Sequence, residues 1–181
     1  FLKKIVSGWG VTEDRITMVY NAVSFPVQPI ERMKLRQQLG LASAAMIVVS
    51  AGRPVPWKGF GVLGRAVAEL QAAGRNIQLV CIGVTDDEMR SMMAEAHAPP
   101  WLVGDDRIRC FGIIYRTELL AWLRAADCFV LNTAYEGLSH LILEAMHAGV
   151  PVITTDVGGN RELVVHNQTG ILVPYNDVEK L

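Results

Sequence analysis

Short apolar runs without polar alternation recur along the chain, and each is separated from the next by a segment with helical periodicity. A strand that is apolar throughout is typical of a sheet buried on both faces. Helical segments between such strands indicate parallel strands joined by crossovers that cover both faces. The pattern therefore predicts an α/β fold, a parallel sheet with helices on both faces.

The expected elements alternate along the length of the chain. We expect strands at Ile16–Tyr20, Ala45–Ser50, Ile77–Ile82, Ile108–Phe111, Cys128–Leu131, Val150–Thr154 and Gly170–Val173. We expect helices at Ile30–Leu39, Gly59–Ala73, Asp86–His97, Arg116–Ala125, Leu138–Ala148 and Asn160–His166.

The two ends of the chain carry helical signals of their own. The segment 1–6 is typical of the end of a helix, and the segment 176–181 of the start of one, with Asn176 or Asp177 as its cap. Because the chain also begins with Phe1 rather than Met, we interpret it as a fragment of a longer protein.

Composition narrows the functional class. With a net charge of −1 over 181 residues and no basic run, the chain lacks the electrostatic footprint of a nucleic-acid-binding protein. No apolar stretch reaches the roughly 18 residues that a membrane-spanning helix needs. The cysteines Cys81, Cys110 and Cys128 each lie in an apolar run, and no Cys-x-x-Cys pair is present. We expect buried, reduced thiols, which favours a cytoplasmic location.

In open α/β sheets, ligands bind beyond the carboxyl ends of the strands. The segments that follow the expected strands are therefore the candidate binding loops: Gly52-Arg53, Gly83, Gly112–Ile114, Asn132–Gly137 and Asp156–Asn160. The first of these loops carries two cations, Arg53 and Lys58. Arginine offers a planar fork for phosphate oxygens and lysine a mobile charge, so the pair suits a diphosphate. The alternative is a pair of solvated surface charges.

Two carboxylates, Glu136 and Glu144, bracket the most informative segment. Glu136 is expected in the loop at a helix N-terminus, and Glu144 about two turns further along. There they can accept hydrogen bonds from two points of one elongated ligand, and the amides of Gly137, Leu138 and Ser139 can hold an anion. Apolar neighbours surround Glu144, and a buried carboxylate needs a partner. That partner is left open between a ligand hydroxyl, a backbone amide and a cation.

The glycines of segment 59–64 match G-x-G-x-x-G, the fingerprint of a dinucleotide site. Such a site needs the first glycine directly after a strand and an acidic residue about 20 positions later. Here the strand is expected to end at Ser50, and position 79 is Leu79. We therefore interpret the glycines as positions that let a helix start close to a neighbour.

Three potential metal ligands, His140, Glu144 and His147, share roughly one face of the expected helix. Their spacing is not that of His-Glu-x-x-His, and no further set of ligands is evident. We predict no metal site.

The ordered set of motifs resembles the C-terminal, nucleotide-sugar-binding domain of retaining glycosyltransferases with a GT-B fold, family 4, also called group 1. The motifs that carry the resemblance are Tyr20-Asn21-Ala22-Val23, Ser50-Ala51-Gly52-Arg53, Trp57-Lys58-Gly59-Phe60, Cys81-Ile82-Gly83, Phe111-Gly112, Tyr135-Glu136-Gly137-Leu138, Leu143-Glu144-Ala145-Met146, Gly149-Val150-Pro151-Val152-Ile153, Asp156-Val157-Gly158-Gly159-Asn160-Arg161-Glu162-Leu163 and Thr169-Gly170-Ile171-Leu172-Val173-Pro174. The resemblance covers almost the whole chain.

The resemblance implies a role for each charged candidate. Arg53 and Lys58 would hold the diphosphate of the donor. Glu144 would accept hydrogen bonds from the ribose hydroxyls. Glu136, the candidate catalytic residue, would face the donor sugar near its anomeric carbon.

The resemblance also implies main-chain contacts to the donor. The amides of Gly137, Leu138 and Ser139 would touch the distal phosphate or the sugar. The loop Gly112–Ile114 would pack on the base, and main-chain atoms of Ile114 would read its edge.

For the chain as a whole, the resemblance implies that residues 1–181 form a nucleotide-sugar-binding domain with a Rossmann-like parallel sheet, the donor half of a GT-B enzyme. The acceptor-binding N-terminal domain and the final C-terminal helix would lie outside this sequence. The full enzyme would transfer a hexosyl group from a UDP-, GDP- or ADP-sugar to an acceptor hydroxyl with retention of configuration. It would need no cofactor and no bound metal, and the fragment alone would turn over little or nothing.

Two alternatives stay open. One is a nucleotide-sugar epimerase of the same fold. The other is a non-catalytic nucleotide-binding module, which would keep the sheet and lose the charged residues that bind the donor. This alternative is disfavoured by the presence of Arg53, Lys58, Glu136 and Glu144. Association of the full-length protein with a membrane is also left open.

Overall fold

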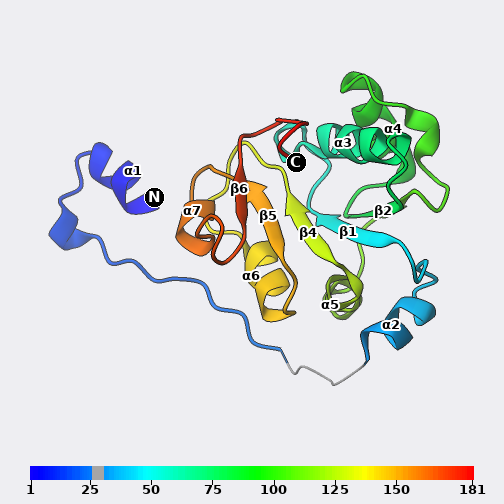
Figure 1. Cartoon of the computed structure of the whole chain (residues 1–181). Coiled ribbons are helices and arrows are strands. Elements are labelled where there is room, and N and C mark those ends of the chain that lie inside the picture. The colour runs from blue at the N-terminus through cyan, green and yellow to red at the C-terminus, as the bar shows by residue number, and fades with distance from the viewer. Residues whose placement is uncertain (26–30) are drawn as a thin grey trace.

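The computed structural model describes residues 1–25 and 31–181, and within them the strands form a six-stranded parallel sheet in the order β3-β2-β1-β4-β5-β6 (Figure 1). The strands are β1 (Met46–Ala51), β2 (Ile77–Ile82), β3 (Ile108–Phe111), β4 (Cys128–Leu131), β5 (Val152–Thr155) and β6 (Ile171–Val173). The predicted Rossmann-like parallel sheet is confirmed.

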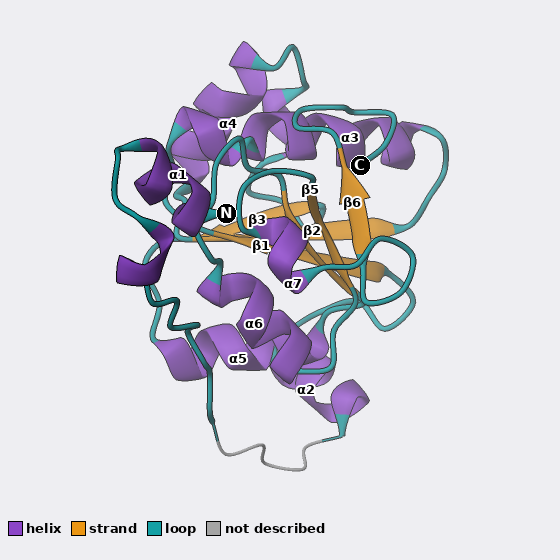
Figure 2. Cartoon of the chain, turned by 90° about the vertical axis from the view of Figure 1, so that its left-hand side faces the viewer, coloured by secondary structure: helices purple, strands orange, loops and turns teal. Residues whose placement is uncertain are grey.

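Helices cover both faces of this sheet, as predicted. The α-helices of the described residues are α1 (Leu2–Gly8), α2 (Arg32–Gln38), α3 (Phe60–Ala72), α4 (Asp86–Glu95), α5 (Arg116–Ala125), α6 (His140–His147) and α7 (Asn160–Leu163). In Figure 2, α3 and α4 lie on one side of the strands, and α2, α5 and α6 lie on the other. No helix within the described ranges is long and apolar enough to cross a membrane.

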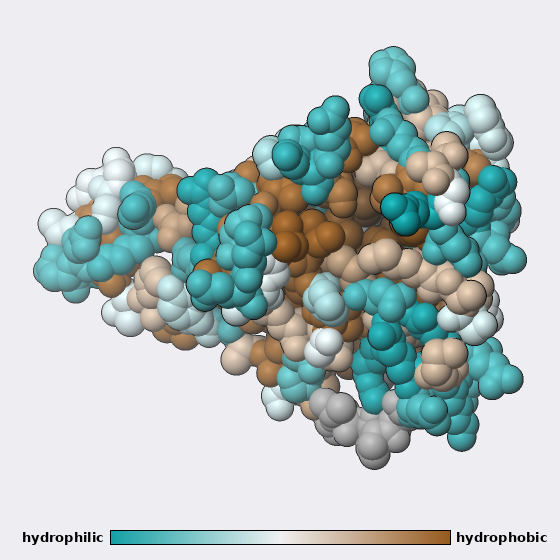
Figure 3. Space-filling view, in the orientation of Figure 1, coloured by the Kyte–Doolittle hydropathy of each residue, from teal (hydrophilic) through white to brown (hydrophobic). Residues whose placement is uncertain are grey.

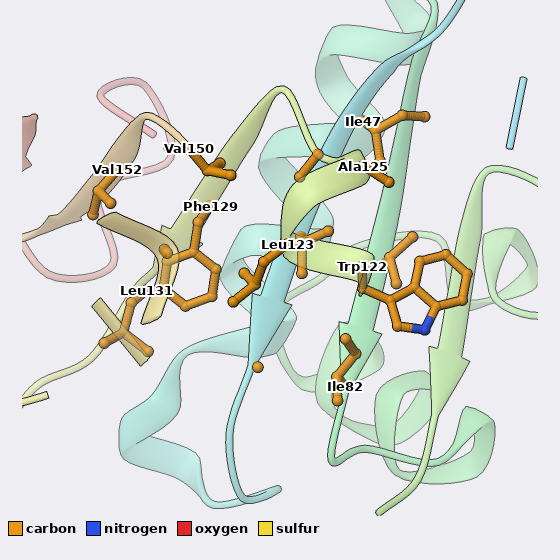
Figure 4. Close-up of a cluster of buried hydrophobic side chains, with 14 of the residues drawn as sticks. Ile47, Ile82, Trp122, Leu123, Ala125, Phe129, Leu131, Val150 and Val152 are labelled. Carbon is orange, nitrogen blue, oxygen red and sulfur yellow. The ribbon is translucent and has the colours of Figure 1, made fainter. Parts of the chain in front are cut away.

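The inner strands β1, β2 and β4 bury side chains on both faces, which explains their mostly apolar sequences. Ile47 and Phe129 point into the cluster under α5 and α6, where Trp122 and Leu123 meet them (Figure 4). Val48 points to the opposite cluster, under α3 and α4. Full burial of such a side chain stabilises the fold by about 1.5–3 kcal/mol. Figure 3 shows apolar surface near the centre of one face, where Figure 1 places β5 and β6.

The strand order creates a topological switch point between β1 and β4. From β1 the chain proceeds to β2 and β3 in one direction, and then returns to build β4, β5 and β6 in the other. The loops after β1 and β4 therefore leave the sheet side by side and continue to opposite faces. This is the place where α/β sheets bind ligands.

The glycines of the G-x-G-x-x-G segment serve helix packing, which confirms their interpretation. A Cβ at Gly61 would lie 2.0 Å from the carbonyl oxygen of Met92, so only glycine lets α3 approach α4 this closely. At Gly64 the same construction meets Met89 at 2.7 Å.

The predicted strand at Ile16–Tyr20 is wrong. The segment has no regular secondary structure, and within the described residues no strand pairs with it. Val19 is 87% exposed. An extended segment becomes a stable strand only with a ladder partner, and the residues here lie beside loops instead of along a sheet edge.

Smaller differences concern where helices begin and end. The predicted helix Asn160–His166 stops at Leu163, because the backbone of Val164 is extended. The helix predicted after Asn176 is a single turn, in which Leu181 N donates to Asp177 O at 3.1 Å. Ile30, the predicted start of the first helix, lies outside the described residues, and α2 begins at Arg32.

Candidate functional site

The loops that follow β1 and β4 are joined by a buried asparagine. The Nδ2 of Asn132 donates to Gly59 O at 3.0 Å and to Asn176 Oδ1 at 2.9 Å, while its Oδ1 accepts from Asn176 N at 3.0 Å. Ala134 N donates to Trp57 O at 2.8 Å. These bonds fix the two loops against each other. The role of Asn132 was not predicted, although its position directly after a buried strand is a signal for it.

The structure brings Lys58 and Glu136 together at this junction. Lys58 Nζ lies 2.5 Å from Glu136 Oε2, and their side chains are only 12% and 21% exposed. Attraction between charges is stronger at such a half-buried position than in water. The cation and the carboxylate predicted from separate loops therefore form one ion pair.

Arg53 lies in the same loop as Lys58 but is exposed to solvent. Within residues 1–25 and 31–181, its side chain forms no hydrogen bond or ion pair. Among the described residues it has no counterion, and it is separate from the Lys58–Glu136 pair.

Two glycines after β5 hold the backbone around Glu136. Gly159 N donates to Glu136 O at 2.9 Å. A Cβ at Gly159 would lie 1.5 Å from Gly137 O, and one at Gly158 would lie 2.2 Å from Glu136 O. Backbone therefore packs directly on backbone. The neighbour of both glycines is the loop that carries Glu136 and Gly137.

Helix α6 starts at this loop. Ser139 caps it, with its Oγ accepting from Ile142 N at 3.4 Å. The backbone N–H groups of Gly137, Leu138 and Ser139 donate to no acceptor in the part of the chain that the structure describes. They sit at the positive end of the helix dipole, an arrangement that binds anions.

Glu144 projects from α6, about 7.5 Å along the helix axis from Ser139 at 1.5 Å per residue. It is 5% exposed. Its Oε1 lies 2.8 Å from Nη2 of Arg116, the first residue of α5. The partner left open by the sequence is therefore a cation. Sequence reasoning missed Arg116, although a cation in the first turn of a helix is an unusual signal.

Aromatic contacts surround Arg116. Its guanidinium carbon lies 4.3 Å from the centroid of the Phe25 ring. The Phe25 ring in turn packs edge-on against His147 with centroids 5.2 Å apart, and His147 Nε2 lies 3.2 Å from Phe25 O. The N-terminal segment thus reaches the α5–α6 contact beside Glu144.

The predicted base-binding loop Gly112–Ile114 runs into α5 directly ahead of Arg116. Ile114 packs against the core cluster under α5 and α6. The loop is therefore linked to Glu144 through Arg116. Glu144 and the Glu136 loop belong to one element, α6 with its preceding residues.

A pocket of about 320 Å³ opens beside the loop that carries Glu136. Helix α1, the segment 16–21, Gly137, Leu138 and Glu162 line it. Tyr20 Oη donates to Glu162 Oε2 at 2.9 Å and helps to close its wall. Within the described ranges, no group of three or more His, Cys, Asp or Glu residues could hold a metal ion.

The chain is similar to proteins of a known family. Residues 31–181 match the family model described as "Glycosyl transferases group 1". A D-inositol 3-phosphate glycosyltransferase of Pseudarthrobacter chlorophenolicus is 31% identical over 177 residues, which is 94% of this chain and 41% of that protein. The chain thus spans about two fifths of the length of the curated relative.

Two solved structures are similar. Sucrose-phosphate synthase of Thermosynechococcus elongatus is 31% identical, with a TM-score of 0.69 over 81% of this chain and 37% of that one. Anabaena HepE, solved in complex with UDP, is 25% identical, with a TM-score of 0.81 over 98% of this chain and 49% of that one.

Proposed function

Because the chain belongs to the group 1 glycosyltransferases, we propose that it is the donor-binding half of an enzyme that transfers a hexosyl group from a nucleoside-diphosphate sugar to an acceptor hydroxyl. The anomeric configuration of the sugar is retained. The acceptor-binding domain is a further part of the same, longer protein. This protein is located in the cytoplasm. The observation that carries the proposal is the meeting of Lys58, Glu136 and the start of α6 at the β1/β4 switch point.

The diphosphate is held by cations and by main-chain amides. Arg53, which has no counterion among the described residues, contacts one phosphate, and Lys58 exchanges Glu136 for another. The N–H groups of residues 137–139 point at the charge that grows on the leaving diphosphate, and preorganised donors of this kind stabilise it. With these groups in place, the reaction requires no metal and no cofactor.

The nucleoside lies towards α5 and α6. Glu144 accepts hydrogen bonds from the ribose hydroxyls with the oxygen that Arg116 leaves free. Main-chain atoms of Ile114 read the edge of the base. The likeness to HepE, which was solved with UDP, favours uridine over guanosine and adenosine.

Glu136 faces the anomeric carbon. As the bond from that carbon to the diphosphate breaks, positive charge develops on the sugar and the Glu136 carboxylate stabilises it. The acceptor hydroxyl attacks from the side of the leaving group, its oxygen bonds to the anomeric carbon, and its proton passes to the departing phosphate oxygen. The carboxylate forms no covalent bond in this scheme.

Calorimetry on the 181-residue chain tests the donor site. We expect UDP, and more weakly GDP or ADP, to bind better than the free nucleoside, because only the diphosphate meets Arg53 and Lys58. Arg53→Ala and Lys58→Ala should each remove roughly 10-fold or more of this preference, since a hydrogen bond to a charged group contributes about 1.5–3 kcal/mol.

The matched control is Lys34→Ala, an exposed lysine on α2. If neither cation variant changes the preference for the diphosphate, the two residues are surface charges and the proposed diphosphate site is wrong.

A further inference from the structure

Arg116 is a residue of this region to which the proposed chemistry assigns no contact with the donor. It is the first residue of α5, and Tyr115 separates it from the loop 112–114. The dipole of α5 disfavours a cation in this first turn, so the helix gains no stability from it there. Contacts of the Arg116 side chain with Glu144 of α6 and with Phe25 explain instead why an arginine stands at this position.

The guanidinium is held from two sides. Glu144 Oε1 lies 2.8 Å from Nη2, and the Phe25 ring centroid lies 4.3 Å from Cζ. His147, on the same helix as Glu144, packs against the Phe25 ring. Although the Arg116 side chain is 54% exposed, these contacts restrict its orientation.

We propose that Arg116 is a positioning residue for the nucleoside: it fixes the Glu144 carboxylate so that Oε2 faces the ribose hydroxyls of the donor. The inference rests on the proposed function. A charged carboxylate that is 5% exposed needs a countercharge, and Arg116 supplies it on one oxygen only. The other oxygen stays a charged acceptor for a diol.

A direct contact between Arg116 and the base is the competing role, because guanidinium groups also stack on planar rings. The two roles predict different results. A positioning residue acts only through the ribose hydroxyls, whereas a base contact acts on any nucleotide with the same base.

The ratio of affinities for ribose and dideoxyribose nucleotides separates them. Calorimetry is performed with whichever of UDP, GDP and ADP the parent chain binds most tightly, and with its 2′,3′-dideoxy form. We expect the parent to prefer the ribose form by about 10- to 100-fold, the range given by hydrogen bonds to a charged acceptor. In Arg116→Ala the preference should fall to about threefold or less. Arg116→Lys, which keeps the charge without the fork, should give an intermediate preference.

Two further variants sharpen the test. Arg65→Ala removes an exposed helical arginine that pairs with Glu69 at 2.9 Å, and it should behave as the parent. Adding Arg116→Ala to Glu144→Ala should cause no further loss, because the two residues act as one unit. Arg116→Gln keeps the aliphatic part of the side chain beside Phe25. If Arg116→Ala does not fold, the same ratio of affinities is measured on Arg116→Gln.

Three results overturn the inference. Equal weakening of both nucleotides assigns Arg116 to the base, and parent-like affinity for both nucleotides in Arg116→Ala or Arg116→Gln makes it a surface residue. Failure of the parent to bind any of the three diphosphates overturns the proposed function and this inference with it. A parent that binds, with variants that keep its preference, overturns this inference alone.

Discussion

Both predicted carboxylates are paired with a cation from the chain itself. Lys58 lies on Glu136, and Arg116 lies on Glu144. An incoming diphosphate therefore replaces Glu136 as the partner of Lys58 instead of meeting a free ammonium group. We infer that Lys58 contributes less to diphosphate affinity than an unpaired lysine would. The exposed Arg53 has no such exchange to make, so we expect it to contribute more than Lys58.

A second group of charged residues lies at the amino ends of the central strands β1 and β4. Asp127 Oδ2 accepts from Ile47 N at 2.7 Å, and the carboxylate pairs with Arg32 at 2.6 Å and with the buried Arg36. Burial raises the pKa of Asp127, but the Ile47 hydrogen bond and the two arginines outweigh it, so the pKa lies below the ordinary value.

The lowered pKa of Asp127 predicts how the stability lost in Asp127→Asn depends on pH. Because the carboxylate is stabilised in the folded state, its contribution is present above the unfolded pKa of about 4 and is lost as pH falls through the lower folded pKa. At pH 7 we expect the variant to be less stable by about 1.5–3 kcal/mol. Urea unfolding at pH 7 and at pH 3 measures the difference, which should narrow at the lower pH. A constant difference across that range would contradict the assignment.

At the scale of elements, the site depends on how closely the loop after β5 approaches the loop before α6. Gly159 has an ordinary φ of −75°, so alanine is excluded there by space and not by backbone conformation. Its Cβ would lie 1.5 Å from Gly137 O. The loop that carries Glu136 would have to move.

We therefore expect Gly159→Ala to lower the free energy of unfolding by about 3 kcal/mol, the upper part of the range for overpacking. It should also weaken nucleotide binding, because Glu136 and the amides of 137–139 shift. Gly8→Ala is the matched control, since a Cβ there meets nothing within 4 Å. Thermal melting and calorimetry that show no difference between Gly159→Ala and this control would refute the packing argument.

Elements buried on both faces were predictable from the sequence. The bounds of β2, β3, β4 and α5 agree with their expected ranges. β4 is a continuous apolar run, β2 and β3 each contain a single polar residue, and α5 has a clear apolar face. The segment Ile16–Tyr20 has the composition of a strand, but pairing depends on a partner that composition does not reveal. The Arg116–Glu144 pair was missed for the same reason, since it joins side chains from two helices.

For the whole molecule, the strand order converts these local features into one site. Residues from the loops after β1 and β4 meet because the sheet reverses its direction of growth between those strands. The alternation of strand and helix segments predicted that loops after the strands would carry the site. It did not predict the contact between Lys58 and Glu136, because this contact depends on the hydrogen bonds of Asn132 that fix both loops.

The most direct test of the donor site is amide chemical-shift mapping of the ¹⁵N-labelled chain during titration with UDP. We expect the largest shifts at Gly137, Leu138 and Ser139, with further shifts at Lys58 and Ile114. Shifts concentrated instead at the opposite edge of the sheet, where Gln71 and Arg107 line a pocket of about 370 Å³, would contradict the account.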